Sequence, residues 1–331
     1  ILNIEKEKKK INSTEFEVID KFDKLNLIKN SNSNVSSFLT IQEGCDKFCK
    51  FCVVPYTRGA EFSRSIKEIL DECKNLVING AKEITLLGQN VNAYNFEEKK
   101  LSNLIYEISK IRNLKRIRYT TSHPSDFSDD LINAHRDIDK LMPLIHLPVQ
   151  SGSNKILKKM NRKHSREEYL EIIQNLISTN PNMRFSSDFI VGYPGENEKD
   201  FKETISLINE VNFINSYSFI FSPRPGTPAA NEEIPDKKIQ NKRLIILQNL
   251  LKNIKEKKNK NEIGKTKAVL VENKMKNQTK YFGRTQDFTP VILLGVNELD
   301  VGKIIYAKIE KYNRNSLFGL KKTNIEKEVA A

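Results

Sequence analysis

The sequence has few cysteines and no long apolar stretch, and both absences narrow the class of protein. Only 4 cysteines occur in 331 residues, and three lie between Cys45 and Cys52, which excludes the disulfide framework of a secreted domain. Apolar runs are short, as in Val291–Leu294, so no segment is predicted to span a membrane. No apolar segment follows the first residues, as a secretory signal would. The sequence therefore predicts a cytoplasmic protein with no membrane partner.

Positive charge is abundant and unevenly placed. The chain carries 55 basic and 42 acidic residues, a net charge of +13, which favours an acidic partner and first of all nucleic acid. Residues 236–284 alone hold 15 basic and 4 acidic side chains, a net of +11. A genome bias toward lysine would raise the charge everywhere, so this concentration favours RNA. Attraction to phosphate gives affinity but little base specificity, which the rest of the chain must supply.

The first two thirds of the chain alternate short β-rich runs with amphipathic helical patterns. The β-rich runs are Phe38–Gln42, Glu83–Leu87, Arg116–Thr120, Leu144–Val149, Arg184–Val191 and Tyr217–Phe221. Apolar residues spaced at helical intervals lie within 66–77, 101–108, 169–177 and 201–211. This alternation predicts βαβ units, a parallel sheet and the α/β fold class.

The character of the chain changes after Pro235. Residues 236–262 are predicted to form one basic amphipathic helix, and short β-rich runs separated by turns follow it. These runs are Ala268–Val271, Tyr281–Gly283, Val291–Leu294 and Ile304–Glu310, and they predict a small all-β barrel. The expected division is a linker over 1–36, an α/β domain over 37–235, the connecting helix over 236–262, the β-barrel over 263–324 and a tail over 325–331.

Three cysteines directly after the first predicted strand carry the chemistry. Cys45, Cys49 and Cys52 have C-x3-C-x2-C spacing, and reduced thiols in such a cluster favour metal binding over a disulfide. Structural zinc requires four ligands, and Cys73 is the only further thiol. Cys73 lies on the apolar stripe of the next helix, where a small buried hydrophobic residue is the better interpretation. Three thiolates fit a 4Fe–4S cluster with one open iron, and structural zinc is the alternative.

Six strings of residues, together with this loop, resemble a known family. They are Cys52-Val-Val-Pro-Tyr-Thr-Arg-Gly59, Leu87-Gly-Gln-Asn-Val-Asn92, Thr120-Thr-Ser-His-Pro124, His146-Leu-Pro-Val-Gln-Ser-Gly152, Ser187-Asp-Phe-Ile-Val-Gly-Tyr-Pro-Gly-Glu196 and Tyr217-Ser-Phe-Ile-Phe-Ser-Pro-Arg-Pro-Gly-Thr-Pro-Ala229. Over roughly residues 37–324 the chain resembles the tRNA methylthiotransferases of the radical S-adenosylmethionine (radical SAM) superfamily, in the branch that methylthiolates C2 of N6-isopentenyladenosine next to the anticodon. The resemblance implies a partial (βα)6 radical SAM barrel followed by a small RNA-binding TRAM barrel.

The resemblance also implies cofactors and roles for single residues. Cys45, Cys49 and Cys52 would ligate three irons of a 4Fe–4S cluster, and S-adenosyl-L-methionine would chelate the fourth. Electron transfer from the cluster would then cleave the sulfonium to give methionine and a 5′-deoxyadenosyl radical. The implied cofactor-binding residues are Phe51 beside the adenine, Gly88, Gln89 and Asn90 at the methionine amino group, Ser122, Gln150 and Asp188 at the methionine or ribose, and Gly192 and Gly195 at the adenine.

Several of these residues also have a simpler structural interpretation. Gly88 and Gly195 each follow a predicted strand, where a glycine commonly makes a turn. Asp188 could cap a strand or helix, and His146 alternates with apolar neighbours as a satisfied core histidine would. Arg224 lies in a rigid Pro-Arg-Pro loop, where it could staple the backbone as well as contact substrate.

The substrate base must leave its stack to reach a radical inside a barrel. Arg58, Arg64 and Arg162 lie near the predicted rim and are, with Arg224, candidates for contacts to RNA; each of the first three could equally be a solvated surface charge. The expected partners are a tRNA anticodon stem-loop and an electron-donating reductase or flavodoxin-like protein. The protein is expected to be a monomer.

The chain departs from the family pattern at its start. The full-length family has an N-terminal domain whose three further cysteines hold a second 4Fe–4S cluster, whereas no cysteine precedes Cys45 here. We therefore expect a truncated chain with one cluster of about four irons that cannot complete methylthiolation. Alternative substrates are threonylcarbamoyladenosine in tRNA and a ribosomal-protein aspartate. The alternative from another class is a non-catalytic RNA-binding protein with a structural metal.

Overall fold

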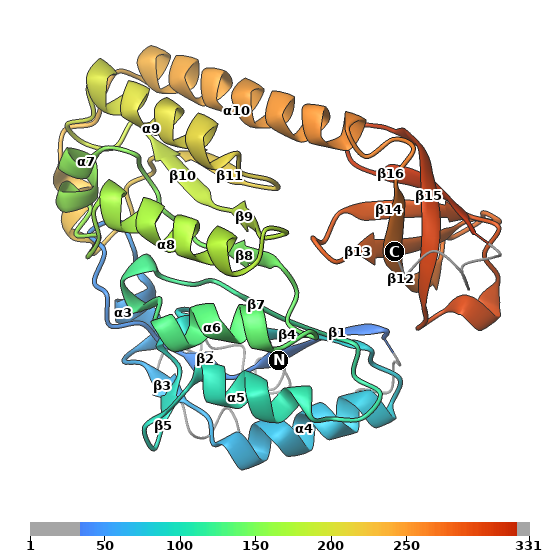
Figure 1. Ribbon diagram of the computed structural model, residues 1–331. Helices are drawn as coiled ribbons and strands as arrows, with labels where there is room; N and C mark the ends of the chain where they lie inside the picture. The colour runs from blue at the N-terminus through green and yellow to red at the C-terminus, as the bar shows by residue number, and fades with distance from the viewer. Residues whose placement is uncertain (1–33, 323–331) are drawn as a thin grey trace, which may run out of the picture.

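The computed structural model describes residues 34–322, which form an α/β half and a small β-barrel (Figure 1). A long helix, α10 (Lys237–Lys260), leads from the α/β half to the barrel and lies within the predicted basic helix. Most of the predicted linker over 1–36, and the predicted tail over 325–331, lie outside the described residues. In this part of the chain no helix has the length and apolarity needed to cross a membrane.

Parallel strands build the sheet of the α/β half where the sequence predicts β-rich runs. They are β1 (Ser36–Thr40), β4 (Glu83–Leu87), β7 (Arg116–Thr120), β8 (Leu144–His146), β9 (Arg184–Ser186), β10 (Asp188–Val191) and β11 (Tyr217–Ile220). Parallel pairing joins β1 to β4 and β4 to β7, β8 to β9, and β10 to β11, so β9 and β10 are one predicted run interrupted at Ser187. Over residues 34–322 no pairing closes β11 onto β1, and the barrel is therefore partial.

The predicted helical stripes all form helices that cover the outer face of the sheet (Figure 1). They are α4 (Ile66–Ile78), α5 (Leu101–Ser109), α8 (Arg166–Thr179) and α9 (Glu198–Val211). Ser65, Ser165 and Asn197 cap α4, α8 and α9 by accepting backbone N–H groups of the first turn. The helices α3 (Val54–Arg58), α6 (Asp129–Asp137) and α7 (Asn154–Lys159) were not predicted, because they are short and carry no sustained apolar stripe.

Short elements complete the α/β half and the turns of the barrel. They are β2 (Gln42–Glu43) with β3 (Phe62–Ser63), β5 (Asn95–Phe96) with β6 (Lys99–Lys100), and the 3-10 turns η1 (Val91–Ala93), η2 (Pro124–Asp126), η3 (Pro228–Asn231) and η4 (Glu298–Asp300).

The two faces of the sheet differ in burial. Leu39, Ile84 and Ile117 are fully buried between the strands and the helices, where they belong to one continuous core. Side chains alternate along a strand, so Phe38 points to the other face, the inner face of the partial barrel, and 69% of it is exposed. Tyr217 is 61% exposed at the opposite edge of the sheet. The inner face is therefore open to solvent and presents aromatic side chains.

The C-terminal part is a closed five-stranded barrel with its own apolar core. Its strands are β12 (Thr266–Lys274), β13 (Tyr281–Thr285), β14 (Pro290–Leu294), β15 (Ile304–Tyr312) and β16 (Leu317–Lys321), in the order β12-β13-β14-β16-β15. The first four were predicted. The last was missed because Leu317–Lys321 is short and is interrupted by Gly319, where a side-chain carbon would come within 3.0 Å of Cβ of Ala307 on β15.

A buried ion cluster fastens the barrel to the α/β half. Glu83 and Arg116 begin β4 and β7, and Arg118 follows on the same strand as Arg116. Glu83 lies 3.2 Å from Arg118 and 3.8 Å from Arg116. Arg116 donates to the carbonyl of Arg284 at 2.8 Å, and Arg118 donates to that of Gln286 at 2.8 Å. The barrel therefore docks at the amino ends of these parallel strands.

Candidate active site

The cysteine loop lies at the opposite end of the strands. It follows β1 and β2 and precedes α3, so it leaves the sheet at the carboxyl ends of the strands, the edge at which α/β barrels build their active sites (Figure 1). The loop is tied to later segments through its backbone. Lys50 donates its N–H to the carbonyl of Met160 at 3.0 Å, and Ala229 donates to the carbonyl of Lys50 at 3.0 Å.

Gly44 fixes the start of the loop. Its φ of 80° lies in the left-handed region, and a side-chain carbon there would come within 1.9 Å of the carbonyl oxygen of Ala60. The N–H of Gly44 donates to Oε1 of Gln89 at 2.7 Å, and Nε2 of Gln42 donates to the carbonyl of Gly44 at 2.8 Å. Only glycine allows this close approach, which sets the position of the thiol that follows.

The three thiols of the loop are close enough to influence one another. Cys49 is buried, whereas Cys45 and Cys52 are half-buried, and all three are free. Burial raises the pKa of Cys45 to about 11, and the nearby Glu61 and the other two cysteines add to that rise. Burial also raises the pKa of Cys52, with a further contribution from Cys49. Deprotonation of these thiols at neutral pH thus needs a metal or another cationic partner.

The arrangement does not suit a single metal ion. Among residues 34–322, no group of three His, Cys, Asp or Glu side chains is placed to hold one metal. Cysteines of a 4Fe–4S cluster bind separate irons and need not converge on one point. Cys73 is fully buried in the core on α4, as the sequence predicts for a small hydrophobic residue. The geometry therefore disfavours structural zinc.

Arg162 lies directly behind the loop. It is 9% exposed; Nη1 donates to Sγ of Cys49 at 3.5 Å, and Nη2 donates to the carbonyl of Pro148. Two buried histidines accompany it, with ring centroids of His123 and His164 5.9 Å apart. Burial, and then the charge of Arg162, lowers the pKa of His164 to about 4 and that of His123 still further. Both imidazoles are neutral, so Arg162 is the positive charge next to Cys49.

A polar network links the loop to two strand ends. Lys47 pairs with Asp126 of η2 at 2.5 Å. Asn90, which follows β4, donates from Nδ2 to Asp126 at 2.6 Å and to Glu61 at 3.0 Å. Its backbone N–H donates to Oε1 of Gln42 at 3.0 Å. Sequence reasoning did not find Asp126, Glu61, or the proximity of Arg162 to Cys49, because each depends on residues distant in sequence that only the fold brings together.

Comparison with known proteins agrees with this geometry. The model of the radical SAM superfamily matches residues 39–208, and that of the TRAM domain matches residues 260–321. A tRNA-2-methylthio-N(6)-dimethylallyladenosine synthase of Pelagibacter ubique is 58% identical over the whole chain and 75% of its own length. A relative with the same name from Wolbachia pipientis subsp. Culex pipiens is 50% identical, over 96% of the chain and 74% of that relative.

The chain belongs to the radical SAM tRNA-2-methylthio-N(6)-dimethylallyladenosine synthase family. Solved structures agree on the radical SAM fold. Coproporphyrinogen III oxidase from Escherichia coli, a radical SAM enzyme, matches with a TM-score of 0.53 and 13% identity, over 91% of this chain and 74% of that one. The radical SAM methyltransferase TsrM from Kitasatospora setae matches with a TM-score of 0.51 and 16% identity, over 60% and 39%. The expected partial radical SAM barrel and TRAM barrel are thus confirmed.

Members of the radical SAM family use a 4Fe–4S cluster and S-adenosylmethionine, and the loop fits these groups. Three thiols come from one loop without the geometry of a single-ion site. Polar atoms with no hydrogen-bond partner among residues 34–322 lie buried beside it, namely Oδ1 of Asn90 and Oγ of Ser122. The segments that carry these two residues meet where the N–H of Val91 donates to the carbonyl of Thr121 at 2.9 Å. Unpartnered buried polar atoms are costly and fit a polar ligand.

The other cofactor residues suggested by the radical SAM resemblance occupy varied environments. Phe51 is half-buried and packs against the apolar cluster that contains Phe221. Gly88 approaches the side chain of Gln42 closely. Gln150 adopts a φ of 73° and is 9% exposed. Asp188 lies 3.5 Å from Nε2 of His146. His146 also contacts Oγ of Ser186 at 2.9 Å, which bears out its interpretation as a satisfied histidine.

Gly192 and Gly195 serve contacts within the protein. Both have positive φ, of 68° and 77°. A side-chain carbon at Gly192 would meet Gln240 of α10 at 2.5 Å, and one at Gly195 would meet Lys159 at 2.5 Å. The missing side chains leave room for these neighbours. An approach of the adenine to either glycine stays a prediction.

The four arginines suggested as RNA contacts divide into two pairs. Arg64 is 3% exposed and bonds the carbonyl of Thr40 and the carboxylate of Glu72, and Arg162 is similarly enclosed. Neither is the surface charge that the sequence suggested, because both fold inward onto backbone carbonyls. Arg224 is exposed, and Arg58 is partly exposed and pairs with Glu43 at 3.1 Å. Of the four, only these last two present cationic groups at the surface.

Proposed function

We propose that the chain is a transferase of tRNA modification that methylthiolates C2 of N6-isopentenyladenosine next to the anticodon. The observation that carries this proposal is the three-cysteine loop at the carboxyl edge of a partial barrel, in a chain 58% identical over its whole length to a synthase of that name. A small RNA-binding-type barrel in the same chain supports tRNA as the substrate. No feature of the described residues favours an aspartate substrate or a non-catalytic role.

Cys45, Cys49 and Cys52 would hold the cluster, and Asn90 and Ser122 offer polar atoms to the methionine part of S-adenosylmethionine. These groups, when bound, supply a 5′-deoxyadenosyl radical. Gln89 would not contact the ligand through Oε1, which already accepts the N–H of Gly44, and instead positions the loop. The remaining predicted contacts, from Phe51, Gly88, Gln150, Asp188, Gly192 and Gly195, are kept as proposals.

The open inner face of the barrel would receive the flipped base. Phe38, Tyr217 and Phe219 are all exposed there, and aromatic faces stack on unpaired bases. Arg58 and Arg224 would contact the RNA near the rim. We also propose that the protein is a cytoplasmic monomer that receives electrons from a reductase or flavodoxin-like protein. The proposed domains are 37–235 for radical chemistry and 263–324 for RNA binding, joined by the helix within 236–262.

Anaerobic reconstitution tests the enzyme proposal. The protein is loaded with iron and sulfide, S-adenosylmethionine and a reductant are added, and 5′-deoxyadenosine is measured with and without prenylated tRNA. We expect 5′-deoxyadenosine to form, and methylthiolated adenosine is measured in the same samples. Absence of 5′-deoxyadenosine under all of these conditions would remove the enzyme proposal.

Cysteine variants give this experiment its control. Cys45→Ala, Cys49→Ala and Cys52→Ala should each abolish 5′-deoxyadenosine formation and the visible absorption of the cluster. Cys73→Ala removes a thiol that is buried in the core on α4, so it should lower only the free energy of unfolding. Loss of the cluster in Cys73→Ala alone would contradict the assignment of the three loop cysteines.

A further inference from the structure

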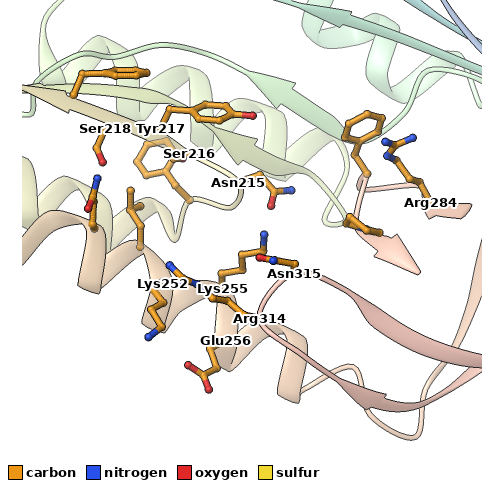
Figure 2. A pocket seen from close by; sticks show the side chains of 16 residues that line it. Asn215, Ser216, Tyr217, Ser218, Lys252, Lys255, Glu256, Arg284, Arg314 and Asn315 are labelled. Atoms are coloured by element: carbon orange, nitrogen blue, oxygen red, sulfur yellow. The ribbon is translucent and has the colours of Figure 1, made fainter. Parts of the chain in front are cut away.

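A cavity of about 610 Å³ lies where α10, β11 and the small barrel meet (Figure 2). Its walls are the segment Asn215–Phe219, one side of α10 from Gln248 to Glu256, and barrel residues that include Arg284 and Arg314. None of the cysteine-loop residues lines it. The cavity is therefore separate from the site described above, and it joins the two halves of the molecule.

Two cations of this cavity lack a carboxylate partner. Lys255 is half-buried, and over residues 34–322 neither it nor Arg314 forms an ion pair with a carboxylate. Burial lowers the pKa of Lys255, and the charges of Lys258 and Arg314 lower it further. The carboxylate of Asp287 is already used, since Lys258 binds it at 2.5 Å. A partly desolvated cation without a partner is unfavourable, and an anionic ligand would remove that cost.

Polar and aromatic groups surround these cations. Figure 2 shows Lys255 and Arg314 between α10 and the barrel, together with Asn315, while Asn215 and Tyr217 lie across the space. The lining also contains the hydroxyls of Ser216 and Ser218 and the amide of Gln248. Cations, amides and hydroxyls are the groups that bind phosphate and sugar in nucleic acids, and the aromatic rings offer stacking faces.

One strand connects the cavity to the cysteine loop. Tyr217 and Phe219 line the cavity from β11, and Phe221 follows at the same two-residue spacing. Phe221 is buried in the cluster against which Phe51 of the cysteine loop packs. Four residues of extended chain span about 13 Å, a distance that a strand of RNA can cover between a bound phosphate and a flipped base.

We propose that this cavity seats the phosphodiester backbone of the RNA substrate through Lys255 and Arg314, while the modified base reaches the inner face of the partial barrel. The proposal rests on the proposed function, because it takes RNA as the substrate. It assigns the cavity an orienting role, since a phosphate held at the junction of both halves sets the direction in which the strand enters the barrel.

Salt-dependent binding tests the proposal. Affinity of the full chain for a fluorescent, prenylated anticodon stem-loop is measured by anisotropy at several salt concentrations. The variant Lys255→Gln/Arg314→Gln should weaken binding and reduce the slope of log K against log salt by about 2, that is, by about 1 for each phosphate that is no longer neutralised. The control is Lys242→Gln/Lys257→Gln, which removes two positive charges from exposed positions of α10 outside the cavity. Its slope should stay that of the wild type.

The outcomes separate this proposal from the proposed function. Equal slopes for the two double variants, with both folded by circular dichroism, would overturn the cavity assignment, and so would absence of RNA binding by the wild type. A lack of 5′-deoxyadenosine with the slope difference intact would overturn only the enzymatic function. Titration with inorganic phosphate at constant ionic strength completes the test. If the cavity variant loses phosphate binding but keeps the control's RNA slope, the cavity takes free anions and the proposal is wrong.

Discussion

Arg162 places a permanent positive charge and an N–H donor next to a thiol of the cysteine loop, at 3.5 Å from Sγ of Cys49. Its other terminal nitrogen is held by the carbonyl of Pro148, so the guanidinium cannot swing away freely. Hydrogen bonds and positive charge near the sulfurs of an iron–sulfur cluster favour its reduced form. Arg162 is therefore a candidate for a residue that positions Cys49 and tunes the cluster.

Replacing Arg162 should change the reduction potential of the reconstituted cluster. We expect Arg162→Met to shift the midpoint potential to more negative values, because the reduced cluster loses a donor and a nearby positive charge. The measurement is a redox titration followed by electron paramagnetic resonance. Arg58→Met is the matched control, since Arg58 is partly exposed and pairs with Glu43. An unchanged potential in Arg162→Met would show that Arg162 has only a packing role.

Gly44 allows a second test at the residue scale. Gly44→Ala should reduce bound iron per chain and lower the free energy of unfolding by more than the roughly 1–2 kcal/mol expected for left-handed strain, because the new carbon would lie 1.9 Å from the carbonyl oxygen of Ala60. Gly264→Ala is the control, with φ of 84° and no atom within 4 Å of the added carbon. Iron content and chemical denaturation measure both effects. Equal losses of stability in the two variants would exclude the steric cause.

At the scale of elements, α6 is joined to β7 by a buried polar pair. The hydroxyl of Tyr119 on β7 lies 2.8 Å from Nε2 of His135 on α6. Burial lowers the pKa of His135 to about 3, so the imidazole is neutral in the folded protein at physiological pH. In the unfolded chain its pKa returns to about 6.5. The unfolded state then binds more protons wherever the pH lies between these values.

This difference gives a pH prediction with a definite sign. Stability should fall as the pH drops from about 6.5 toward 3, by up to about 1.4 kcal/mol per pH unit from His135, since protonation favours the unfolded chain. His135→Gln should lose this contribution, so its free energy of unfolding should decline less steeply than that of the wild type. Chemical denaturation at several pH values below neutrality compares the two slopes. Identical slopes would show that His135 does not contribute.

Elements were predictable to the extent that their pattern is local. Every parallel strand and the four helices α4, α5, α8 and α9 follow from period-2 or helical spacing of apolar residues. The helix α6 was missed because its apolar residues are few and its sequence is rich in charged groups. The interruption of one strand at Ser187 was missed too. There Oγ of Ser187 donates to the carbonyl of Leu147 at 3.0 Å, a bond that depends on tertiary placement.

At the scale of the whole molecule, the buried trio of Glu83, Arg116 and Arg118 holds the barrel to the α/β half. Both arginines donate to backbone carbonyls of the barrel, so the ion cluster and the domain contact are one structure. Arg118 also stacks over the ring of Phe288, 4.7 Å from its centroid. The fixed docking keeps α10 and the barrel in place around the cavity proposed to bind RNA.

Breaking this trio should be costly. Arg118→Met should lower the free energy of unfolding by about 3–5 kcal/mol, because Glu83 stays buried with a weaker partner. Glu83→Leu/Arg118→Met should cost less than the sum of the two single variants, since the pair disappears together. Calorimetry and chemical denaturation measure these values. Strict additivity of the two changes would contradict a direct interaction between them.

The sequence by itself determined the fold class, the family and the cysteine loop, because these depend on local spacing and on motifs that are contiguous in the chain. It also placed most of the positive charge over residues 236–284. Only the tertiary structure decided where that charge goes: Arg243 is buried against Glu196, whereas Lys255 lies in a cavity with no carboxylate of residues 34–322 bound to it. It likewise turned Arg64 and Arg162 inward. The reason is physical, since whether a cation is paired, buried or free depends on neighbours that lie far along the chain.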